Sequence, residues 1–407
     1  MKRIVVINNT IKALNYGMGA YTRNLAECLK QTGFAFDFVY VHAEAYELQI
    51  VAKDGYREFY IPSFQQSSSQ KLQAYCRMLP FLLKELFGDD DEIIFHFNHF
   101  ILSHVSDGLK RMFNCRILFT VHYTDWGLAL HGNVRKLNSL LKKKHAVSAD
   151  EQRTIDSIET NREIFQQADL IIFLAQHTVK TYSGISLLQG VNFTIVNNGL
   201  KDDYKKLSSA QKRSIRKRYH IKEHETILFF AGWLTEVKGI YDLIAAFQQV
   251  LRSKPDTHLF IAGEGNFPKL LAAARPACAQ ITFLGLLNKT ELHDFYSIAH
   301  IGVVCSLYEE FGLVALEMMM HQLPVVVTNT GGLAEIVDDN INGLKVPIVS
   351  KKGKRFVDTN HLARKIAFLI DNPAECLRLG KNARKKFLAN YELSIFSAKM
   401  IQIYQSI

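Results

Sequence analysis

The stretch IGVVCSLYEEFGLVALE, residues 301–317, carries the clearest structural signal in this sequence. An apolar run ends at Cys305, a polar loop follows, and a helical pattern begins near Gly312. A continuous apolar strand that leads through a loop into a helix is typical of a parallel sheet covered on both faces. Glu309 and Glu317 lie eight positions apart in this stretch. We therefore predict a strand–loop–helix unit with two carboxylates around the start of its helix.

The same alternation of apolar strands and helical segments extends along the chain. Strands are expected at residues 3–8, 36–41, 93–98, 116–122, 170–174 and 193–196, with helices at 20–31, 71–86 and 149–167. After a polar, basic stretch at 201–222, strands are expected at 226–231, 258–262, 281–284, 301–304 and 325–328. The tail from residue 362 is expected to be helical, with a break at Asn372-Pro373. This pattern predicts two doubly wound α/β units in series.

Length and composition agree with a globular enzyme of more than one domain. The chain has 407 residues, against roughly 150 per ordinary domain, and 48% of them are hydrophobic, which excludes a disordered protein. The six cysteines form no C-x-x-C pair, so we expect reduced core thiols rather than a disulfide scaffold or zinc ribbon. No signal peptide or membrane-spanning segment is predicted, and we expect a cytoplasmic protein. The net charge of +10 is compatible with phosphorylated ligands, an anionic membrane or nucleic acid.

Two glycine-containing loops follow predicted strands. Gly17 and Gly19 follow the first strand, and Gly263 and Gly265 follow the strand at 258–262. Glycines between a strand and a helix let the backbone approach a phosphate or a sugar at the helix N-terminus. A tight turn that requires a positive φ explains each loop equally well when it is taken alone.

Two further loops suit a phosphate. Gly232 and Trp233 follow the strand at 226–231, and Lys238 is expected at the start of the next helix, either as a phosphate-binding cation or as a surface lysine. In the stretch quoted first, the amides of Phe311, Gly312 and Leu313 would face outward at a helix N-terminus, which suits a diphosphate. The alternative is an acidic loop that only complements the helix dipole.

Taken together in their order along the chain, these loops and the stretch 301–317 resemble the GT-B glycosyltransferases, most closely the large retaining family with an E-x7-E motif (family 4). Glu309 and Glu317 match the two glutamates of that motif. Residues 330–335 match its G-G-x-x-E turn, and residues 283–286 resemble the strand end that contacts the nucleotide base. Residues 322–326 match its G-x-P-V-V segment, except that Gln322 replaces the glycine.

The resemblance implies a fold and a domain arrangement. Two Rossmann-like doubly wound domains would face each other across a cleft. Residues 1–200 would form the acceptor-binding domain and residues 201–388 the nucleotide-sugar donor-binding domain. A C-terminal helix, within residues 389–407, would cross back to the first domain.

The resemblance also implies site residues. Lys238, Glu309 and His122 would be catalytic: Lys238 would bind the diphosphate, Glu309 would lie near the sugar hydroxyls, and His122 would lie beside the transferred sugar. Glu317 would hydrogen-bond the ribose, and Gly19 would approach the diphosphate from the first domain. The remaining donor contacts would come from Gly17, Gly232, Trp233, Gly263, Gly265, Leu286, Phe311, Gly312 and Leu313. Trp233 departs from the family, which has an arginine there that clamps the diphosphate together with the lysine.

The reaction implied is the retaining transfer of a sugar from a nucleotide-diphosphate donor, with a UDP-sugar favoured, to an acceptor hydroxyl. No metal or other cofactor is implied. The acceptor could be a saccharide, a lipid-linked compound, a peptide or a small molecule. The departure at Trp233 suggests one alternative, a nucleotide-sugar-binding partner subunit with little catalysis of its own. A sugar-nucleotide epimerase is a further alternative, which the motif pattern fits less well.

Other charged or histidine-containing segments have simpler explanations. Residues 89–91 are three aspartates that resemble a metal-binding D-x-D, but an acidic turn is favoured there. His96 and His99 would point to opposite faces of a strand, which argues against a metal pair. The basic stretch at 135–144 is either an amphipathic segment that contacts an anionic membrane or, as we favour, a solvated helix face. No aromatic-interleaved basic motif supports nucleic-acid binding.

Overall fold

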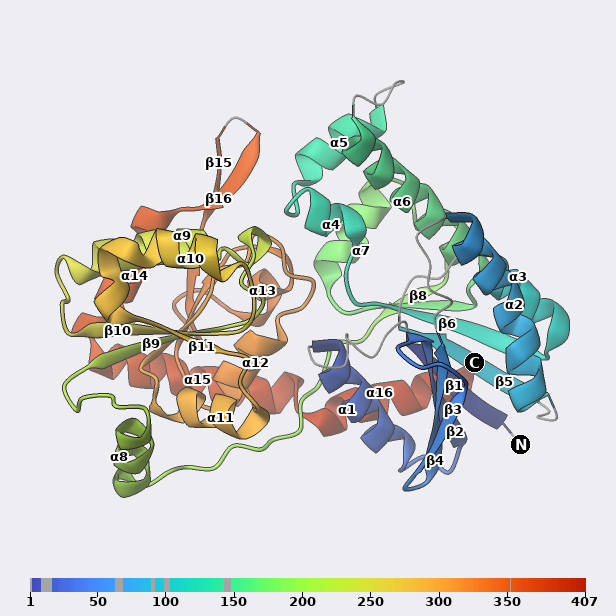
Figure 1. Ribbon diagram of the computed structural model, residues 1–407, viewed down its shortest axis with the longest axis horizontal. Coiled ribbons are helices and arrows are strands. Elements are labelled where there is room, and N and C mark those ends of the chain that lie inside the picture. Colours follow the sequence, from blue (N-terminus) through green and yellow to red (C-terminus); the bar gives the residue numbers. More distant parts are fainter. Residues whose placement is uncertain are drawn as a thin grey trace. The chain divides into compact units, whose positions relative to one another are not determined.

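The computed structural model describes residues 2–8, 17–62, 69–88, 92–98, 103–142, 148–351 and 353–407. The chain divides into two compact units, each described here by itself (Figure 1). Unit 1 comprises Met1–Trp126, Leu137–Gly199 and Leu393–Ile407, and unit 2 comprises Gly127–Lys136 and Leu200–Glu392. The chain therefore leaves unit 1 at Gly199, and its last helix returns there. The short segment 127–136 belongs to unit 2 although it interrupts unit 1 in the sequence.

Unit 1 is built on an eight-stranded sheet with the strand order β3-β4-β2-β1-β5-β6-β7-β8. Among the strands that the structure describes in this sheet, only β3 is antiparallel to its neighbour. The elements up to the linker are β1 (Lys2–Asn8), α1 (Gly17–Leu29), β2 (Ala35–Ala43), β3 (Gln49–Lys53), β4 (Tyr56–Pro62), α2 (Ser69–Phe87), β5 (Glu92–Phe97), α3 (Ser103–Met112), β6 (Cys115–Val121), α4 (Asp125–Ala129), α5 (Val134–Lys142), α6 (Ala149–Gln167), β7 (Leu170–Phe173), α7 (Gln176–Gly184) and β8 (Phe193–Ile195).

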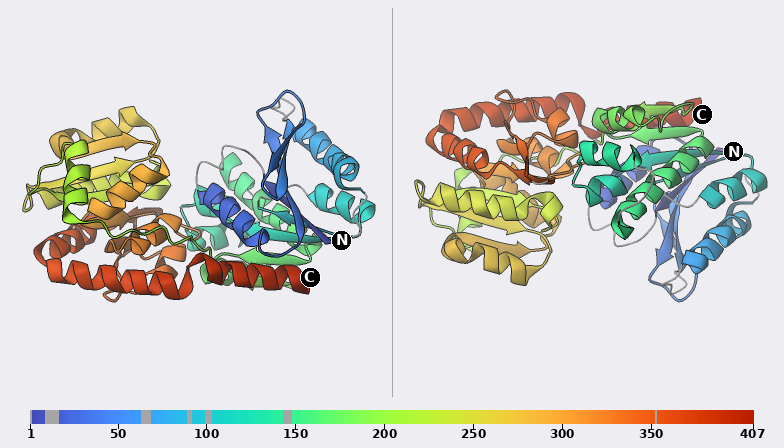
Figure 2. Two further views of the ribbon diagram at one scale, coloured as in Figure 1. Left: turned by 90° about the horizontal axis from the view of Figure 1, so that it is seen from below. Right: turned by 90° about the horizontal axis from the view of Figure 1, so that it is seen from above.

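Helices cover both faces of this sheet (Figure 2). Alternate residues of β1 point to opposite faces of the sheet, and Ile4 and Val6 pack on α1 and on α16 (Leu393–Ser406). The helices α2, α3 and α6 pack together elsewhere in the unit. Tyr404 of α16 is fully buried, and its hydroxyl lies 2.6 Å from Nδ1 of His96 on β5. The last helix is therefore an integral part of the unit 1 core.

Unit 2 is built on a six-stranded parallel sheet with the order β11-β10-β9-β12-β13-β14 and a separate β15–β16 hairpin. Its elements are α8 (Ser209–Arg218), β9 (Thr226–Ala231), the 3-10 helix η2 (Glu236–Lys238), α9 (Ile240–Leu251), β10 (Thr257–Ala262), α10 (Phe267–Ala274), the 3-10 helix η3 (Arg275–Gln280), β11 (Ile281–Gly285), α11 (Lys289–Ile298), β12 (Ile301–Val304), α12 (Leu313–Met320), β13 (Val325–Thr328), α13 (Gly331–Ile336), β14 (Leu344–Val346), β15 (Ile348–Lys351), β16 (Lys354–Val357), α14 (Thr359–Asp371) and α15 (Pro373–Asn390).

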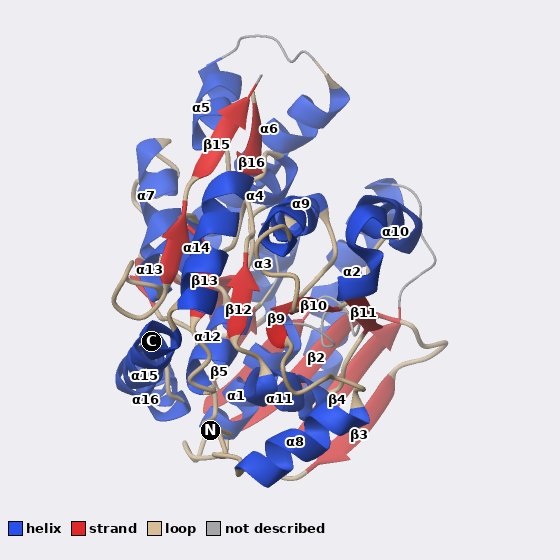
Figure 3. Cartoon of the chain, turned by 90° about the vertical axis from the view of Figure 1, so that its left-hand side faces the viewer, coloured by secondary structure: helices blue, strands red, loops and turns tan. Residues whose placement is uncertain are grey.

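Alternate strand residues again determine which helices cover each face of the sheet in unit 2. Leu228 and Phe230 of β9 join a buried cluster with α9 and α14, whereas Phe229 stacks on Phe295 of α11 at 5.1 Å between ring centroids. Figure 3 shows these strands between their flanking helices. The continuous apolar runs of the sequence are thus explained by burial on both faces.

Both units have the predicted doubly wound α/β architecture, with one correction to the cysteines. Cys28, Cys76 and Cys305 are buried, but Cys278 is exposed at the surface of η3, so the expectation of a core thiol was wrong there. None of the helices within the described ranges is long and apolar enough to span a bilayer.

Candidate functional site

The topology of unit 2 marks one edge of its sheet as the place for a ligand. The strand order reverses its direction between β9 and β12, and open parallel sheets bind ligands at the carboxyl ends of the strands beside such a switch point. The loop after β9 carries Gly232, Trp233 and Lys238, and the loop after β12 carries Glu309 and Gly312. Most of the sequence-predicted donor residues therefore gather at this edge without any appeal to a family.

Lys238 and Glu309 form an ion pair at the switch point. Lys238 Nζ lies 2.7 Å from Glu309 Oε2, and the two side chains are 29% and 17% exposed. Ser306 Oγ donates a second hydrogen bond to the same oxygen at 3.0 Å. Lys238 is the last residue of η2 and is separated from α9 by Gly239, rather than standing in the first turn of that helix as expected. The lysine charge is thus held beside the loop that leads into α12.

The N-terminus of α12 presents backbone donors next to this pair. Gly312 caps the helix with a φ of +110°, a conformation that favours glycine. Within the described part of the chain, no hydrogen-bond acceptor is found for the amides of Phe311, Gly312 and Leu313. The first amides of a helix have no intrahelical partner and attract anions. This end of α12 can therefore hold an anionic group beside Lys238.

Glu317 lies one helical turn and a half further along α12 and is oriented by a buried tyrosine. The Tyr296 hydroxyl donates to Glu317 Oε2 at 2.6 Å. Burial, reinforced by the Glu317 charge, raises the pKa of Tyr296 well above its ordinary value, so the phenol stays protonated and remains the donor. His321 donates through Nδ1 to the Glu317 carbonyl at 2.9 Å, and burial lowers its pKa to about 4, so it is neutral at pH 7. Glu317 is thus a fixed, partly exposed carboxylate.

The loops after β9 and β10 need glycine because they lie against each other. A Cβ at Gly263, whose φ is +136°, would lie 1.8 Å from the Gly232 carbonyl oxygen. A Cβ at Gly265 would lie 2.5 Å from the Leu234 carbonyl oxygen. Close backbone approach within the protein accounts for both residues, which favours the tight-turn explanation for this loop over direct ligand contact.

Two large apolar side chains are exposed at the same edge of the sheet. Trp233 is 51% exposed and Leu286, just after β11, is 53% exposed. Exposed apolar groups at the ends of sheet strands can stack on a flat or apolar ligand. Both residues belong to the donor-binding set that the sequence predicts, and their role there stays a prediction.

The G-G-x-x-E turn forms α13 and supports the Glu309 loop. The Gly332 amide donates to the Glu309 carbonyl at 3.0 Å. A Cβ at Gly332 would lie 2.3 Å from the Phe311 carbonyl oxygen, and one at Gly331 would lie 2.0 Å from that of Glu309. The two glycines therefore allow α13 to begin directly against the loop that carries the first glutamate.

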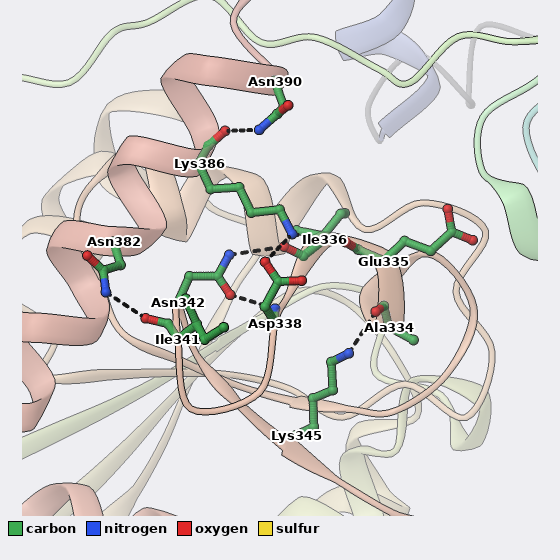
Figure 4. Close-up of polar contacts among 10 residues, drawn as sticks. All are labelled: Ala334, Glu335, Ile336, Asp338, Ile341, Asn342, Lys345, Asn382, Lys386 and Asn390. Carbon is green, nitrogen blue, oxygen red and sulfur yellow. Dashed lines mark hydrogen bonds and ion pairs between the residues drawn. The ribbon is translucent and has the colours of Figure 1, made fainter.

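The other end of α13 is held by three side chains (Figure 4). The last carbonyls of a helix lack intrahelical donors, and cations near them interact favourably with the helix dipole. Three side chains donate to these carbonyl oxygens: Lys345 to that of Ala334 (2.7 Å), Lys386 to that of Glu335 (3.1 Å) and Asn342 to that of Ile336 (3.2 Å). The Glu335 side chain points away from this cluster in Figure 4. Both ends of α13 are thus fixed.

In unit 1, the predicted residues also lie at the carboxyl edge of the sheet. Gly17 and Gly19 begin α1 after β1, and His122 directly follows β6. His122 Nε2 lies 3.2 Å from Asn98 Oδ1, and its ring meets the Tyr21 ring edge-on at 4.4 Å between centroids. His122 is half-buried, so one side of it faces the edge of the sheet.

His96 has no capacity left for a metal. Its Nδ1 lies 2.6 Å from the Tyr404 hydroxyl and its Nε2 lies 2.7 Å from Thr120 Oγ1. Burial lowers its pKa to about 3. In the described ranges, no group of three or more histidine, cysteine or acidic residues could hold a metal ion. The aspartates at 89–91 and His99 lie outside the described residues.

The basic stretch at 135–144 is described as far as residue 142. Leu137 and Leu140 of α5 are buried in the protein, while Arg135, Lys136 and Lys142 are exposed. The apolar side of this helix is therefore covered, in agreement with a solvated helix face.

Sequence reasoning missed the side chains that position the predicted ones. Ser306 lies inside the stretch quoted first, three residues before Glu309, and could have been found as a helix-proximal hydroxyl. Tyr296 lies on α11 and has no sequence spacing that links it to Glu317.

Comparisons with known proteins concern the fold and the kind of protein that this chain resembles. A family model described as "Glycosyl transferases group 1" matches residues 211–386. The glycogen synthase of Mycobacterium tuberculosis is 27% identical over 314 residues, which cover 76% of this chain and 68% of that protein. For the first curated relatives, the match spans between 36% and 68% of their own length.

Two solved structures are similar over the whole chain. Sucrose-phosphate synthase from Thermosynechococcus elongatus has a TM-score of 0.81 at 22% identity, covering 100% of this chain and 99% of its own. HepE of Anabaena, solved with UDP and glucose, has a TM-score of 0.74 at 14% identity and covers 100% of both chains. At these identities the likeness concerns the fold. The chain thus has the fold of the GT-B glycosyltransferases, and its residues 211–386 match the model of the glycosyl transferases group 1.

Proposed function

We propose that this protein is a retaining, metal-independent glycosyltransferase of the E-x7-E type that uses a nucleotide-diphosphate sugar, with UDP as the favoured nucleotide. The observation that carries the proposal is the cluster at the β9–β12 switch point. There the Lys238–Glu309 pair lies beside the α12 N-terminus, whose first amides have no acceptor among the described residues.

The proposed chemistry is mainly electrostatic. A diphosphate leaves while positive charge develops on the sugar, and fixed donors at the departing oxygens lower the barrier. Lys238 and the amides of 311–313 stabilise the leaving group. Glu309 stabilises the sugar and its developing charge, and Glu317 accepts hydrogen bonds from the ribose. The acceptor hydroxyl is held on the face from which the diphosphate leaves, which is catalysis by positioning.

The residues of unit 1 keep the roles that the family resemblance implies. Gly17 and Gly19 approach the diphosphate, and His122 contacts the transferred sugar. The hydrogen bond with Asn98 and the edge-on contact with Tyr21 fix the orientation of the His122 ring for that role.

Nucleotide binding tests the proposal. Thermal unfolding of the full chain is measured with UDP, GDP, ADP and their sugars; a ligand at 100 times its Kd stabilises by about 2.7 kcal/mol. Glu317→Gln should weaken binding by roughly 10-fold or more, because a hydrogen bond to a charged group is worth about 1.5–3 kcal/mol. Tyr296→Phe is the matched control, since it removes the hydrogen bond of the pair but keeps the carboxylate. The donor assignment would be refuted if none of these nucleotides or their sugars stabilised the protein.

The second candidate function is a nucleotide-sugar-binding subunit with little catalysis, and Trp233 is the observation that favours it. Turnover of the donor identified above is compared in wild type and Trp233→Arg. A large gain in the variant would mean that the wild-type site lacks a catalytic cation, as a binding subunit would. A loss of turnover in the variant would show that Trp233 itself contributes to an active site.

A further inference from the structure

A cavity of about 510 Å³ lies next to the proposed donor site in unit 2. It is lined by the β15–β16 hairpin, by the start of α9 and by part of the segment 127–136. Glu236 and Gly239, which flank Lys238 in the chain, belong to its wall, but none of the proposed donor residues does. Its volume is within the range of about 300–1,000 Å³ typical of small-molecule sites. It is therefore a separate space beside the leaving-group lysine.

Three cations line this cavity around one histidine. Lys136, Lys354 and Arg355 are all part of its wall, together with His131. Burial of the ring is the main reason why the pKa of His131 is lowered; the three cations lower it further, while Glu236 raises it. The positive charges are thus close enough to one another to act on the same imidazole.

Arg355 is the most informative of these cations because it is half-buried. Its Nη1 donates to the His131 carbonyl at 2.6 Å, and a Cβ at Gly132 would lie 2.8 Å from the same nitrogen. Burial lowers the pKa of Arg355. In the part of the chain that the structure describes, no carboxylate forms an ion pair with Arg355, Lys354 or Lys136. A cation taken out of water without a counter-ion is unfavourable, so an anion is the natural occupant of this position.

The wall of the cavity also carries two carboxylates, those of Glu236 and Asp242. Asp242 Oδ2 accepts a hydrogen bond from the Val357 amide at 2.8 Å, which also ties the hairpin to α9. Burial raises the pKa of Asp242, the Val357 hydrogen bond lowers it, and Glu236 raises it, while no cation contributes. Asp242 and Glu236 are therefore grouped together, and they offer oxygen acceptors for hydroxyl groups.

We propose that this cavity binds the acceptor, and that the acceptor is a phosphorylated hydroxyl compound of the sugar-phosphate class. The phosphate would lie on Arg355, Lys354 and Lys136, and the hydroxyls would face Glu236 and Asp242. A guanidinium matches the geometry of phosphate oxygens, and carboxylates accept hydrogen bonds from sugar hydroxyls. This inference rests on the proposed function, since it names the acceptor class of the same transferase. It departs from the expectation that residues 1–200 alone bind the acceptor, because only the segment 129–136 of the cavity wall comes from them.

Calorimetric titration of the full chain tests the inference, with glucose 6-phosphate, inorganic phosphate and uncharged glucose as probes. We expect glucose 6-phosphate to bind most tightly and glucose not to bind. Arg355→Gln should weaken glucose 6-phosphate binding by at least about 10-fold, as for the loss of a charge-assisted hydrogen bond. Arg364→Gln is the matched control, because it removes an exposed guanidinium on α14 that does not line the cavity, and it should leave the affinity unchanged.

A second series of titrations, in saturating UDP, tells whether the cavity takes the phosphate of an acceptor or the diphosphate of the donor. If the cavity holds the acceptor, glucose 6-phosphate binds equally well with UDP present. Competition by UDP would assign the cavity to the donor diphosphate and overturn the inference. Unchanged affinity in Arg355→Gln, or no binding of either phosphate to wild type, would overturn it as well.

Controls for folding and for the proposed function are independent of these results. UDP binding by Arg355→Gln reports whether that variant is folded, and Lys354→Gln, which changes an exposed side chain, replaces it if it is not. Failure of wild type to bind any nucleotide would refute the donor assignment, and with it the acceptor role, but not the binding of phosphate in the cavity. Failure to bind phosphate compounds would refute the cavity and leave the donor assignment in place.

Discussion

Replacing Glu309 with glutamine is expected to change UDP binding and turnover in opposite directions. Glu309 Oε2 accepts from Lys238 Nζ at 2.7 Å and from Ser306 Oγ at 3.0 Å. Glutamine can keep an oxygen acceptor at this position but carries no charge. Lys238 is then no longer neutralised, and more of its charge is available to a diphosphate.

The exposure of the pair sets the size of the effect on binding. The Lys238 and Glu309 side chains are 29% and 17% exposed, so solvent still screens their attraction. Ion pairs of this kind contribute up to about 1 kcal/mol, which corresponds to roughly a fivefold change in an equilibrium constant. The Kd for UDP should therefore fall by up to about fivefold in Glu309→Gln. Turnover of the nucleotide sugar should fall by about 10²–10³-fold, the usual cost of losing one electrostatic contact in a transition state.

Calorimetry with UDP and a coupled assay for released UDP measure the two quantities. Ser306→Ala is the matched control, because it removes a neutral donor to the same oxygen and leaves both charges in place. We expect its Kd for UDP to stay close to that of wild type. Weaker UDP binding in Glu309→Gln, or an unchanged kcat, would refute the reasoning.

Two further predictions concern stability. Gly263→Ala should destabilise the protein by at least about 3 kcal/mol in chemical unfolding, since a positive φ and overpacking act together. Gly285→Ala should cost only about 1–2 kcal/mol, because Gly285 has a φ of +71° but no atom of the described residues lies within 4 Å of its Cβ position. Equal losses would contradict the close-approach argument. Because burial lowers the pKa of His96 to about 3, the unfolded chain binds a proton below its ordinary pKa of about 6.5 that the folded chain does not, so stability should fall as the pH drops from about 6.5 toward 3, by up to about 1.4 kcal/mol per pH unit from this group. Urea unfolding of wild type and His96→Gln across this range isolates that contribution, and identical slopes would show that His96 is not its source.

The central strands could be predicted from the sequence because each is a continuous apolar run buried on both faces. The ranges 226–231, 301–304 and 325–328 coincide with β9, β12 and β13. The hairpin β3–β4 was not predicted, because all five residues of β3 are exposed and its apolar run, residues 50–52, is only three residues long. The β15–β16 hairpin was missed for the same reason, since most of its residues are exposed.

The site could be predicted where its residues follow a strand directly. Lys238, Glu309 and Gly312 lie in loops at strand ends, so local sequence was enough to place them at one edge of the sheet. Tyr296 and Arg355 were not predictable, because their contacts depend on how α11 and the β15–β16 hairpin pack in three dimensions. The roles assigned to all these residues stay predictions until binding and turnover are measured.

The place of α16 has a consequence for the order in which the protein can mature on the ribosome. Phe396, Met400 and Tyr404 complete the core of unit 1, yet they are translated after every residue of unit 2. At about 5–20 residues per second, the apolar face beneath α16 stays uncovered for roughly 10–40 s after residue 199 has been added. Unit 2 can close its core during that interval. We therefore expect nascent unit 1 to bind a chaperone during this interval. Unit 1 is translated before most of unit 2 but becomes native after it.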